Sequence, residues 1–329
     1  MTNARFILKR YYDILENDTP AYFFQTKNIP VCFSKSESTK SLWKKHERAF
    51  TQRPTTFSHQ QTLLDLKIEL ASRIFMKCIF CEHRCLVDRT KTAGFCGVRH
   101  TAIASEFLHY GEEPDLIPSY TIFFSGCTFR CVFCQNYDIS QQICGTILEP
   151  QKLAERISLR YHQNAKNVNW VGGEPTSHLP YILSVLKYTT TNIPMIWNSN
   201  MYCSRETMKL LQGIVDVYLT DFKYGNNRCA ERLSQSTTYL RMVKRNHRIA
   251  YHQGEVIVRH LILPSHVQCC SKQILRWIAN NIPQCMVNIM DQYRPCYQAS
   301  NYPDIARPIS SKEYTHVTLL AEQLGLHCY

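Results

Sequence analysis

From residue 121 onward, short apolar runs alternate with longer stretches whose apolar residues recur at helical spacing. The short runs are rich in β-branched and aromatic residues, which favour strands. Strands separated by helices of this length predict right-handed β-α-β units and a parallel sheet. The predicted strands are residues 121–124, 168–171, 193–197, 215–219, 255–263 and 285–290. The predicted helices are residues 150–162, 178–189, 204–213, 226–234, 271–281 and 310–325.

Six such units fit two α/β architectures, an open doubly wound sheet and an incomplete β/α barrel. The apolar pattern alone does not choose between them. Both architectures gather ligand-binding groups at the carboxyl ends of the parallel strands. The residues that directly follow each apolar run are therefore the first candidates for a functional site.

The chain divides into three predicted segments. Residues 1–57 are polar and basic with weak periodicity, and we expect a peripheral N-terminal extension of short helices. Residues 58–118 begin with leucines at helical spacing and continue into a cysteine-rich stretch, so we expect a helix that leads into a metal-binding segment. Residues 119–329 form the predicted α/β domain.

The composition is typical of a globular protein, with 44% hydrophobic residues among 329. No apolar run approaches the roughly 20 residues of a membrane helix, and the first residues lack the order of a secretory signal. Seven of the 16 cysteines fall in two tight clusters. In a reducing compartment such clusters indicate metal ligands rather than disulfides. We therefore expect a cytoplasmic protein that is not inserted in a membrane.

The net charge of +12 is unevenly distributed. Residues 1–100 hold 17 Lys and Arg against 9 Asp and Glu, a net charge of +8. A basic region of this kind suits an acidic protein surface or nucleic acid. Nucleic acid is the less favoured partner, because a pI near 9 is common among proteins.

Three cysteines, Cys127, Cys131 and Cys134, follow the first predicted strand at C-x3-C-x2-C spacing. A structural zinc site would need a fourth nearby Cys or His, but the next cysteine is Cys144 and no histidine appears before His162. A 4Fe-4S cluster normally has four cysteine ligands, so three leave one iron open. A small molecule with an amine and a carboxylate could chelate that iron and receive an electron.

The cysteine motif, with Phe133 as its aromatic residue, resembles the C-x3-C-x-aromatic-C signature of the radical S-adenosylmethionine (SAM) superfamily. The predicted strand 168–171 runs into GGEPT, which resembles that superfamily's second motif. The pair Asp221-x-Lys223 is similar to a motif of the glycyl radical enzyme activating enzymes, such as pyruvate formate-lyase activating enzyme. A longer likeness, over about residues 61–325, points to the PflX-like branch of these proteins.

This resemblance implies a partial (β/α)6 TIM-type barrel with a cysteine-rich, mainly helical N-terminal extension. It also implies a 4Fe-4S cluster on Cys127, Cys131 and Cys134, with SAM on the open iron. No catalytic residue is expected beyond the cluster and SAM. In this resemblance Phe133 lines the adenine. The SAM amine is expected at Gly172, Gly173 and Glu174, and the carboxylate and ribose at Asn198, Ser199, Asp221 and Lys223. Asn198 stands where the activating enzymes tend to have an aspartate.

The implied reaction is reductive cleavage of SAM to a 5′-deoxyadenosyl radical, with an external flavodoxin- or ferredoxin-type protein as the electron donor. The implied substrate is a glycine of a glycyl radical enzyme, which would make the protein an activase. Two alternatives stay open. One is radical SAM modification of RNA or of another peptide or protein, and the other is a non-catalytic metal-binding interaction protein.

A second group of four cysteines, at C-x2-C-x3-C-x10-C spacing, comprises Cys78, Cys81, Cys85 and Cys96. Four thiolates in so short a stretch suit a closed zinc site and an auxiliary iron-sulfur cluster equally well. Between the two cysteine groups, the segment H-x-GEEP offers His109 and Glu112 as pocket candidates, with a structural turn as the alternative.

Overall fold

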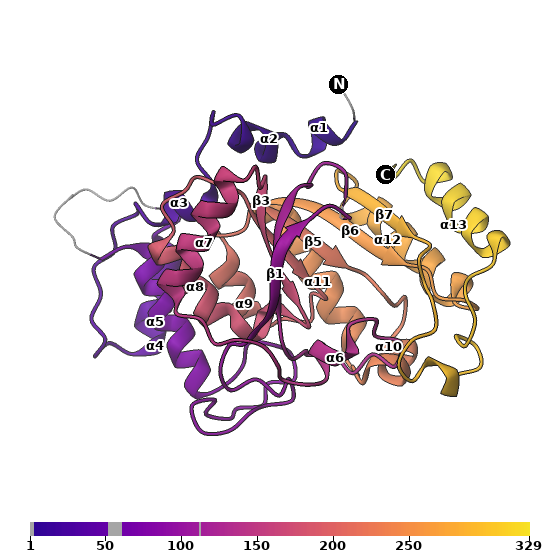
Figure 1. Cartoon of the computed structure of the whole chain (residues 1–329), viewed down its shortest axis with the longest axis horizontal. Coiled ribbons are helices and arrows are strands. Elements are labelled where there is room, and N and C mark those ends of the chain that lie inside the picture. Colours follow the sequence, from indigo (N-terminus) through magenta and orange to yellow (C-terminus); the bar gives the residue numbers. More distant parts are fainter. Residues whose placement is uncertain (1–2, 52–60, 112) are drawn as a thin grey trace.

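The computed structural model describes residues 3–51, 61–111 and 113–329, and contains one curved sheet of eight strands in sequential order (Figure 1). Strand β1 pairs antiparallel with β2, and every later pair is parallel. The predicted α/β fold, a partial β/α barrel, is confirmed. The strands are β1 (Ile103–His109), β2 (Ser119–Phe124), β3 (Asn167–Gly172), β4 (Met195–Ser199), β5 (Val217–Asp221), β6 (Glu255–Leu261), β7 (Met286–Met290) and β8 (His327–Cys328).

All six predicted strands are present, but several end later than predicted. The apolar run at 193–197 is followed by Asn198 and Ser199, which still pair with β5. The strand therefore continues past the last apolar residue, whereas the apolar pattern placed these polar residues outside it. Strands β1 and β8 were not predicted, because the sequence of β1, IASEFLH, has neither a continuous apolar run nor a strict alternation, and β8 has only two residues.

Helices cover the outer face of the sheet between successive strands (Figure 1). Those that coincide with predicted helices are α5 (Leu63–Met76), α7 (Pro150–His162), α8 (Leu179–Tyr188), α9 (Arg205–Leu211), α10 (Asn227–Ser234), α12 (Lys272–Asn281) and α13 (Ser311–Gln323). Helix α11 (Tyr239–Gln253) was not predicted. Its buried face includes Asn246 and His247, and these polar residues interrupt the apolar periodicity.

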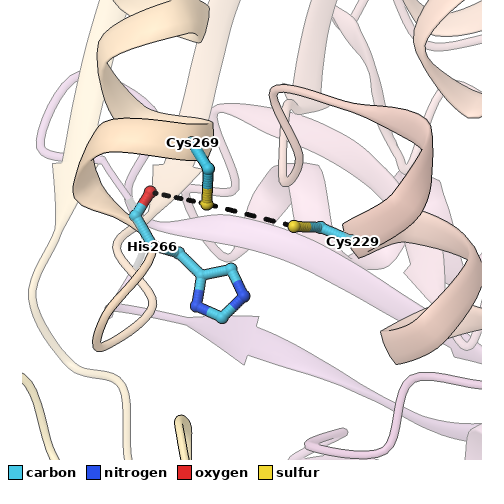
Figure 2. A group of neighbouring side chains, drawn as sticks. All are labelled: Cys229, His266 and Cys269. Atoms are coloured by element: carbon cyan, nitrogen blue, oxygen red, sulfur yellow. Dashed lines mark hydrogen bonds between the residues drawn. The ribbon is translucent and has the colours of Figure 1, made fainter.

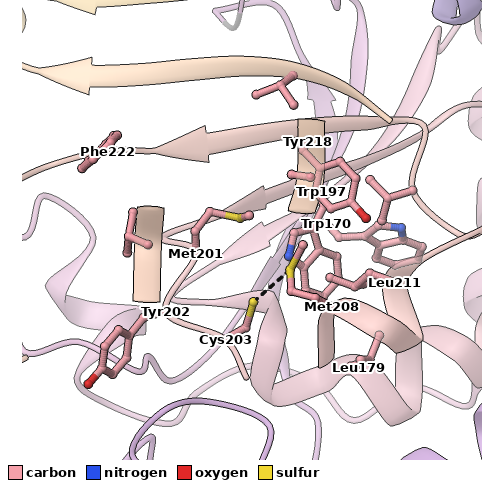
Figure 3. Close-up of a cluster of buried hydrophobic side chains, with 14 of the residues drawn as sticks. Trp170, Leu179, Trp197, Met201, Tyr202, Cys203, Met208, Leu211, Tyr218 and Phe222 are labelled. Atoms are coloured by element: carbon pink, nitrogen blue, oxygen red, sulfur yellow. Dashed lines mark hydrogen bonds between the residues drawn. The ribbon is translucent and has the colours of Figure 1, made fainter. Parts of the chain in front are cut away.

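Large side chains fill the space between the sheet and these helices (Figure 3). Trp170 of β3 pairs directly with Trp197 of β4, and both are buried. Leu179 of α8 and Met208 of α9 pack in the same cluster. In the described part of the chain, no helix is both long and apolar enough to cross a membrane.

The N-terminal residues form α1 (Asn3–Ile7), α2 (Lys9–Leu15), α3 (Tyr22–Thr26) and α4 (Thr39–Arg48). Figure 1 shows α1 and α2 across one end of the sheet. Leu8 and Tyr11 are buried in a cluster with Ile196, Val217 and Ile257. These N-terminal residues therefore contribute to the core, whereas the sequence suggested a peripheral extension. The predicted segment boundary at residue 57 lies outside the described residues.

The carboxylate of Glu255, at the start of β6, anchors the N-terminus of α2. Its two oxygens accept hydrogen bonds from the backbone N–H groups of Arg10 (2.6 Å) and Tyr11 (2.9 Å). These donors lack partners within their own helix, and the positive end of the helix dipole favours a carboxylate. Burial nevertheless dominates and raises the pKa of Glu255 to about 7.

We predict that Glu255→Gln changes the pH dependence of stability. Because the folded-state pKa lies above the ordinary value, the contribution of Glu255 is fully present below about pH 4.5 and is lost as the pH rises through 7. The free energy of unfolding of the variant, relative to that of the parent, should therefore rise by about 2–3 kcal/mol from pH 5 to pH 8. Urea unfolding at both pH values measures this.

The matched control is Glu155→Gln, on the exposed face of α7. Its difference from the parent should be the same at both pH values. A pH-independent difference for Glu255→Gln would contradict the prediction.

Candidate active site at the carboxyl edge of the sheet

A cavity of about 160 Å³ lies at the carboxyl ends of the central strands. Parallel pairing brings these ends to one edge, so loops far apart in sequence share it. Its lining residues are Cys127, Phe129, Cys131, Cys134, Asn136, Ser140, Val171, Gly172, Gly173, Glu174, Asn198, Asn200, Asp221, Lys223 and Arg259. The structure thus brings together most of the residues predicted from the sequence to bind a cofactor.

The loop with the three cysteines follows β2 and is fastened to the end of α10. The backbone N–H groups of Arg130 and Val132 donate to the carbonyls of Ser234 (3.1 Å) and Leu233 (3.0 Å). The guanidinium of Arg130 also donates to the carbonyl of Cys127, at 3.0 Å. These bonds hold the loop without using the thiols.

Each thiol of this loop has a hydrogen-bonding neighbour. The Cys131 Sγ lies 2.9 Å from the Ser234 Oγ, and the Cys134 Sγ lies 3.2 Å from the Ser140 Oγ. The backbone N–H of Phe129 donates to the Cys127 Sγ at 3.3 Å. Such contacts stabilise thiolates and tune iron-sulfur clusters.

The chemistry of the three thiols fits an iron-sulfur cluster. Burial raises the pKa of Cys127 and raises that of Cys131 to about 11, so without a metal both would keep their protons at neutral pH. Within the described residues, the cavity lining contains these three cysteines and no other cysteine or histidine. Three thiolates bind three irons of a cubane and leave the fourth iron open. The residues therefore fit a 4Fe-4S cluster.

The two glycines of GGEP bring the end of β3 against the cysteine loop. Gly172 has a φ of 120°, and an added Cβ would lie 2.0 Å from the backbone N of Phe124. A Cβ on Gly173 would lie 2.1 Å from the carbonyl oxygen of Gly126. Only glycine allows this approach.

Glu174 is buried in the wall of the cavity, and both of its oxygens accept hydrogen bonds. Oε1 accepts from Thr176 Oγ1 (2.6 Å) and Ser199 Oγ (2.7 Å), and Oε2 accepts from the backbone N–H of Asn200 (3.0 Å). Burial raises its pKa despite these bonds. Glu174 therefore ties the end of β3 to the end of β4, and its contact with an amine stays a prediction.

Polar side chains from β4, β5 and β6 complete the cavity. Asn198 is 5% exposed, and its Nδ2 is buried with no hydrogen-bond partner. This donor fits the carboxylate or hydroxyl of a bound molecule, because a buried donor is costly to leave unpaired. The Lys223 ammonium pairs with Asp221, and the Arg259 guanidinium lies 3.9 Å from the same carboxylate.

Two predicted cofactor residues lie outside the cavity lining. The Phe133 ring packs against Tyr293, with centroids 5.8 Å apart, and against Tyr224. Ser199 points to Glu174 instead. Their contacts with SAM stay predictions.

Sequence reasoning missed Arg259 and Asn200, although each had a signal. Arg259 is a cation inside an apolar strand, and Asn200 belongs to the polar run that contains Asn198. No sequence pattern indicated that Ser234 belongs to the site, because only the packing of α10 brings it next to Cys131.

The second cysteine group abuts this site. Cys78, Cys81 and Cys96 are buried, and Cys85 is partly exposed. The Arg130 guanidinium donates to the carbonyl of Phe95, next to Cys96. In the described part of the chain, the four sulfur atoms do not form a group as tight as 4.8 Å. A bound metal there, zinc or iron-sulfur, stays a prediction.

In the H-x-GEEP segment, the buried carboxylate next to the cavity residue Arg259 belongs to Glu113 and not to a predicted pocket residue. The Nδ1 of His109 accepts a hydrogen bond from the backbone N–H of Gly111 at 3.1 Å, and His109 does not line the cavity. Glu112 lies outside the described residues. The next residue, Glu113, is buried and accepts from Asn288 at 2.9 Å, with Arg259 3.9 Å away.

Comparison with known proteins agrees with this geometry. The radical SAM superfamily profile matches residues 121–278, which include the cysteine loop and the cavity residues. The chain belongs to the radical SAM superfamily. It is also 44% identical to the uncharacterized protein MJ0674 of Methanocaldococcus jannaschii over 335 residues, 97% of this chain and 98% of that protein.

Solved structures similar to this radical SAM protein are more distant. Streptococcus suis SuiB, bound to its precursor peptide SuiA, has 14% identity and a TM-score of 0.43 over 61% of this chain and 46% of that one. A domain of pyruvate-formate lyase-activating enzyme from Bacteroides vulgatus has 15% identity and a TM-score of 0.40 over 50% of this chain and 97% of that one.

We predict that three cysteines, and not Cys144, hold the iron of this site. Cys134→Ala should lower the iron bound after anaerobic reconstitution by about four atoms per chain, because a cubane needs all three thiolates. Cys144→Ala should leave the iron content unchanged. Iron and sulfide analysis measures both, and an equal loss in the two variants would contradict the assignment.

Proposed function

We propose that this radical SAM enzyme activates a glycyl radical enzyme by removing a hydrogen atom from a glycine of that partner. The observation that carries the proposal is one cavity that combines three cysteine thiols, two close-packed glycines and an unpartnered amide donor. The Asp221-x-Lys223 pair at the end of β5, similar to the activating enzymes, supports the activase role.

The residues of the chain bind and orient the cofactors. Cys127, Cys131 and Cys134 would ligate a 4Fe-4S cluster, which when bound and reduced supplies the electron that cleaves SAM. Asn198 Nδ2 would donate to the SAM carboxylate or ribose. Lys223 would face the same side of SAM, with its charge balanced by Asp221.

Hydrogen-atom abstraction moves a proton and an electron together, so the proposal needs no general base. This agrees with the buried groups of the cavity. Glu174 is occupied by hydrogen bonds within the protein, and the Asp221 carboxylate is paired with Lys223. The chain's contribution is positioning and exclusion of water.

An open sheet edge supports a polypeptide as the substrate. In the described residues, the only strand that pairs with β1 is β2, apart from an isolated bridge between Ile103 and Thr146, and the only strand that pairs with β8 is β7. Strands β1 and β8 do not pair with each other, so the barrel is not closed. A loop of a partner protein could reach the cavity from this side.

The sixteen free cysteines also suit a reducing compartment, and we place the protein in the cytoplasm.

A basic groove supports an acidic electron-donor protein of the flavodoxin or ferredoxin type. The groove has a volume of about 560 Å³, and α11 contributes Arg241, Arg245 and Arg248 to it. Glu82, the neighbour of Cys81, pairs with Arg245 at 2.9 Å. The groove therefore runs beside the second cysteine group. A metal cluster there would lie between the donor and the active site.

The same groove favours a second candidate, radical SAM modification of RNA, because clustered arginines also bind phosphates. The two candidates differ in what the groove binds. A non-catalytic interaction protein is not retained, because the chain belongs to a superfamily of enzymes.

We predict that the anaerobically reconstituted protein, reduced with dithionite, converts SAM to 5′-deoxyadenosine. Cys131→Ala should abolish this product, while Cys32→Ser, a change at an exposed cysteine, should leave it intact. Adding the partner glycyl radical enzyme should give a glycyl radical by electron paramagnetic resonance. Product without any radical on candidate partners would contradict the activase role but not the cleavage of SAM.

We also predict that charge reversal in the groove slows reduction by a flavodoxin. Arg241→Glu with Arg248→Glu should lower the rate of cluster reduction by reduced flavodoxin about tenfold at low salt, because steering by opposite charge is lost. Reduction by dithionite should not change. Arg276→Glu, at an exposed residue of α12 outside the groove, is the control. Loss of RNA binding with unchanged flavodoxin reduction would favour the RNA candidate.

A further inference from the structure

A third group of metal-ligating side chains lies outside the cavity. In the described part of the chain, one set of three has all its ligand atoms within 4.8 Å of one another: Cys229, His266 and Cys269 (Figure 2). Neither the radical SAM motif nor the group Cys78 to Cys96 includes these residues. They had no signal in the sequence, because Cys229 is far along the chain from the other two.

Two elements bring the three residues together. Cys229 lies in the first turn of α10, and Cys269 lies on a short π-helical turn, η2 (Val267–Ser271), which His266 precedes. Asn226 links the two elements. Its Oδ1 accepts from the backbone N–H of Cys229 (2.8 Å), and its Nδ2 donates to the carbonyl of Cys269 (3.0 Å).

The sulfur separation suits a shared metal ion. The Sγ atoms of Cys229 and Cys269 are 4.0 Å apart, about twice the length of a disulfide bond of roughly 2.05 Å. Two thiolates on one tetrahedral zinc are about 3.8 Å apart, given a Zn–S bond of about 2.3 Å. Only a small movement would bring both sulfurs to ligand positions.

His266 presents the nitrogen that a metal needs. It is 4% exposed, and its Nδ1 lies 2.8 Å from the carbonyl oxygen of Pro264. A carbonyl only accepts, so Nδ1 carries the hydrogen and Nε2 keeps a lone pair. A carbonyl that fixes the ring in this way is the usual outer partner of a metal-binding histidine.

The groups around His266 Nε2 include a cation and an anion. Arg232 Nη2 is 3.4 Å and Asp304 Oδ2 is 3.5 Å from this nitrogen, and Arg232 pairs with Asp304. The arginine donates to the lone pair in the absence of a metal and must turn away when one binds. The Asp304 carboxylate balances its charge and offers an oxygen for the fourth ligand position.

We propose that Cys229, His266 and Cys269 bind one zinc-type divalent ion, with water or Asp304 as the fourth ligand. Thiolate and imidazole ligands select zinc over the hard cations magnesium and calcium. Binding releases one proton from each thiol to solvent and changes no oxidation state. Cys269 is exposed, so an ion can enter from solvent.

The site would stiffen the helix that holds the active-site loop. The first turn of α10 carries Cys229, and its last residues accept the hydrogen bonds of Arg130 and Val132. An ion that ties α10 to η2 therefore limits the movement of Ser234, the neighbour of the Cys131 thiol. The role is structural and does not depend on the proposed substrate.

The test counts zinc on the full-length protein after its iron-sulfur clusters have been reconstituted anaerobically and loose metal removed. After addition of Zn²⁺, the parent should retain one more zinc per chain than the double variant Cys229→Ser/Cys269→Ser by mass spectrometry, whichever metal the group Cys78 to Cys96 holds. Cys269→Ser and His266→Ala should each weaken zinc binding at least about tenfold, measured by competition with a chromophoric chelator. Cys32→Ser, at an exposed cysteine elsewhere, should bind zinc like the parent.

Two results would overturn the proposal. One is equal zinc content in the parent, Cys269→Ser and the double variant Cys229→Ser/Cys269→Ser, which would place the ion elsewhere. The other is a Cys229–Cys269 disulfide in the anaerobic parent, detected by alkylation and peptide mass analysis. Cys269 lies on the surface, so Cys269→Ser should fold, and its iron content provides the check.

Discussion

The parallel pairing of β2 to β6 is the constraint on which the site depends. It places the carboxyl ends of five strands on one edge, so that residues from Cys127 to Arg259 line a single cavity. None of these residues would form a site within its own segment. The cysteine loop offers three thiols, the end of β3 offers two glycines without side chains, and the later strands offer the polar groups.

Close backbone packing fixes the relative positions of the strand ends and the cysteine loop at this edge. Gly172 and Gly173 press β3 against β2 and its loop, while Glu174 fastens β3 to β4. On the other side, α10 holds the loop by two backbone hydrogen bonds. The thiols are thereby left for a metal. Burial of thiols and carboxyl groups in this region is unfavourable for their charged forms, and a cluster would relieve this for the thiols.

Short sequence patterns were enough to predict the elements whose structure depends on residues near in sequence. The parallel strands and the three-cysteine loop follow from runs of a few residues. Helix α11 was not predicted because its core face carries the polar residues Asn246 and His247. The amide of Asn246 donates to the carbonyls of Met201 and Cys203, which only the folded chain brings near. The position of α2 on the sheet could not be predicted from the sequence, because the carboxylate that holds it belongs to Glu255, 245 residues after Arg10 in the chain. The same holds for Ser234 at Cys131, which tertiary packing alone brings into contact.

The proposed chemistry requires a cluster that three cysteines hold with one iron open to SAM. Electron paramagnetic resonance of the dithionite-reduced protein, recorded with and without SAM, reports on that open iron. The signal of one cluster should change its g values when SAM is added, while any signal from the second cysteine group should stay the same. A reduced cluster signal that SAM leaves entirely unchanged would mean that SAM does not bind an open iron of the cluster.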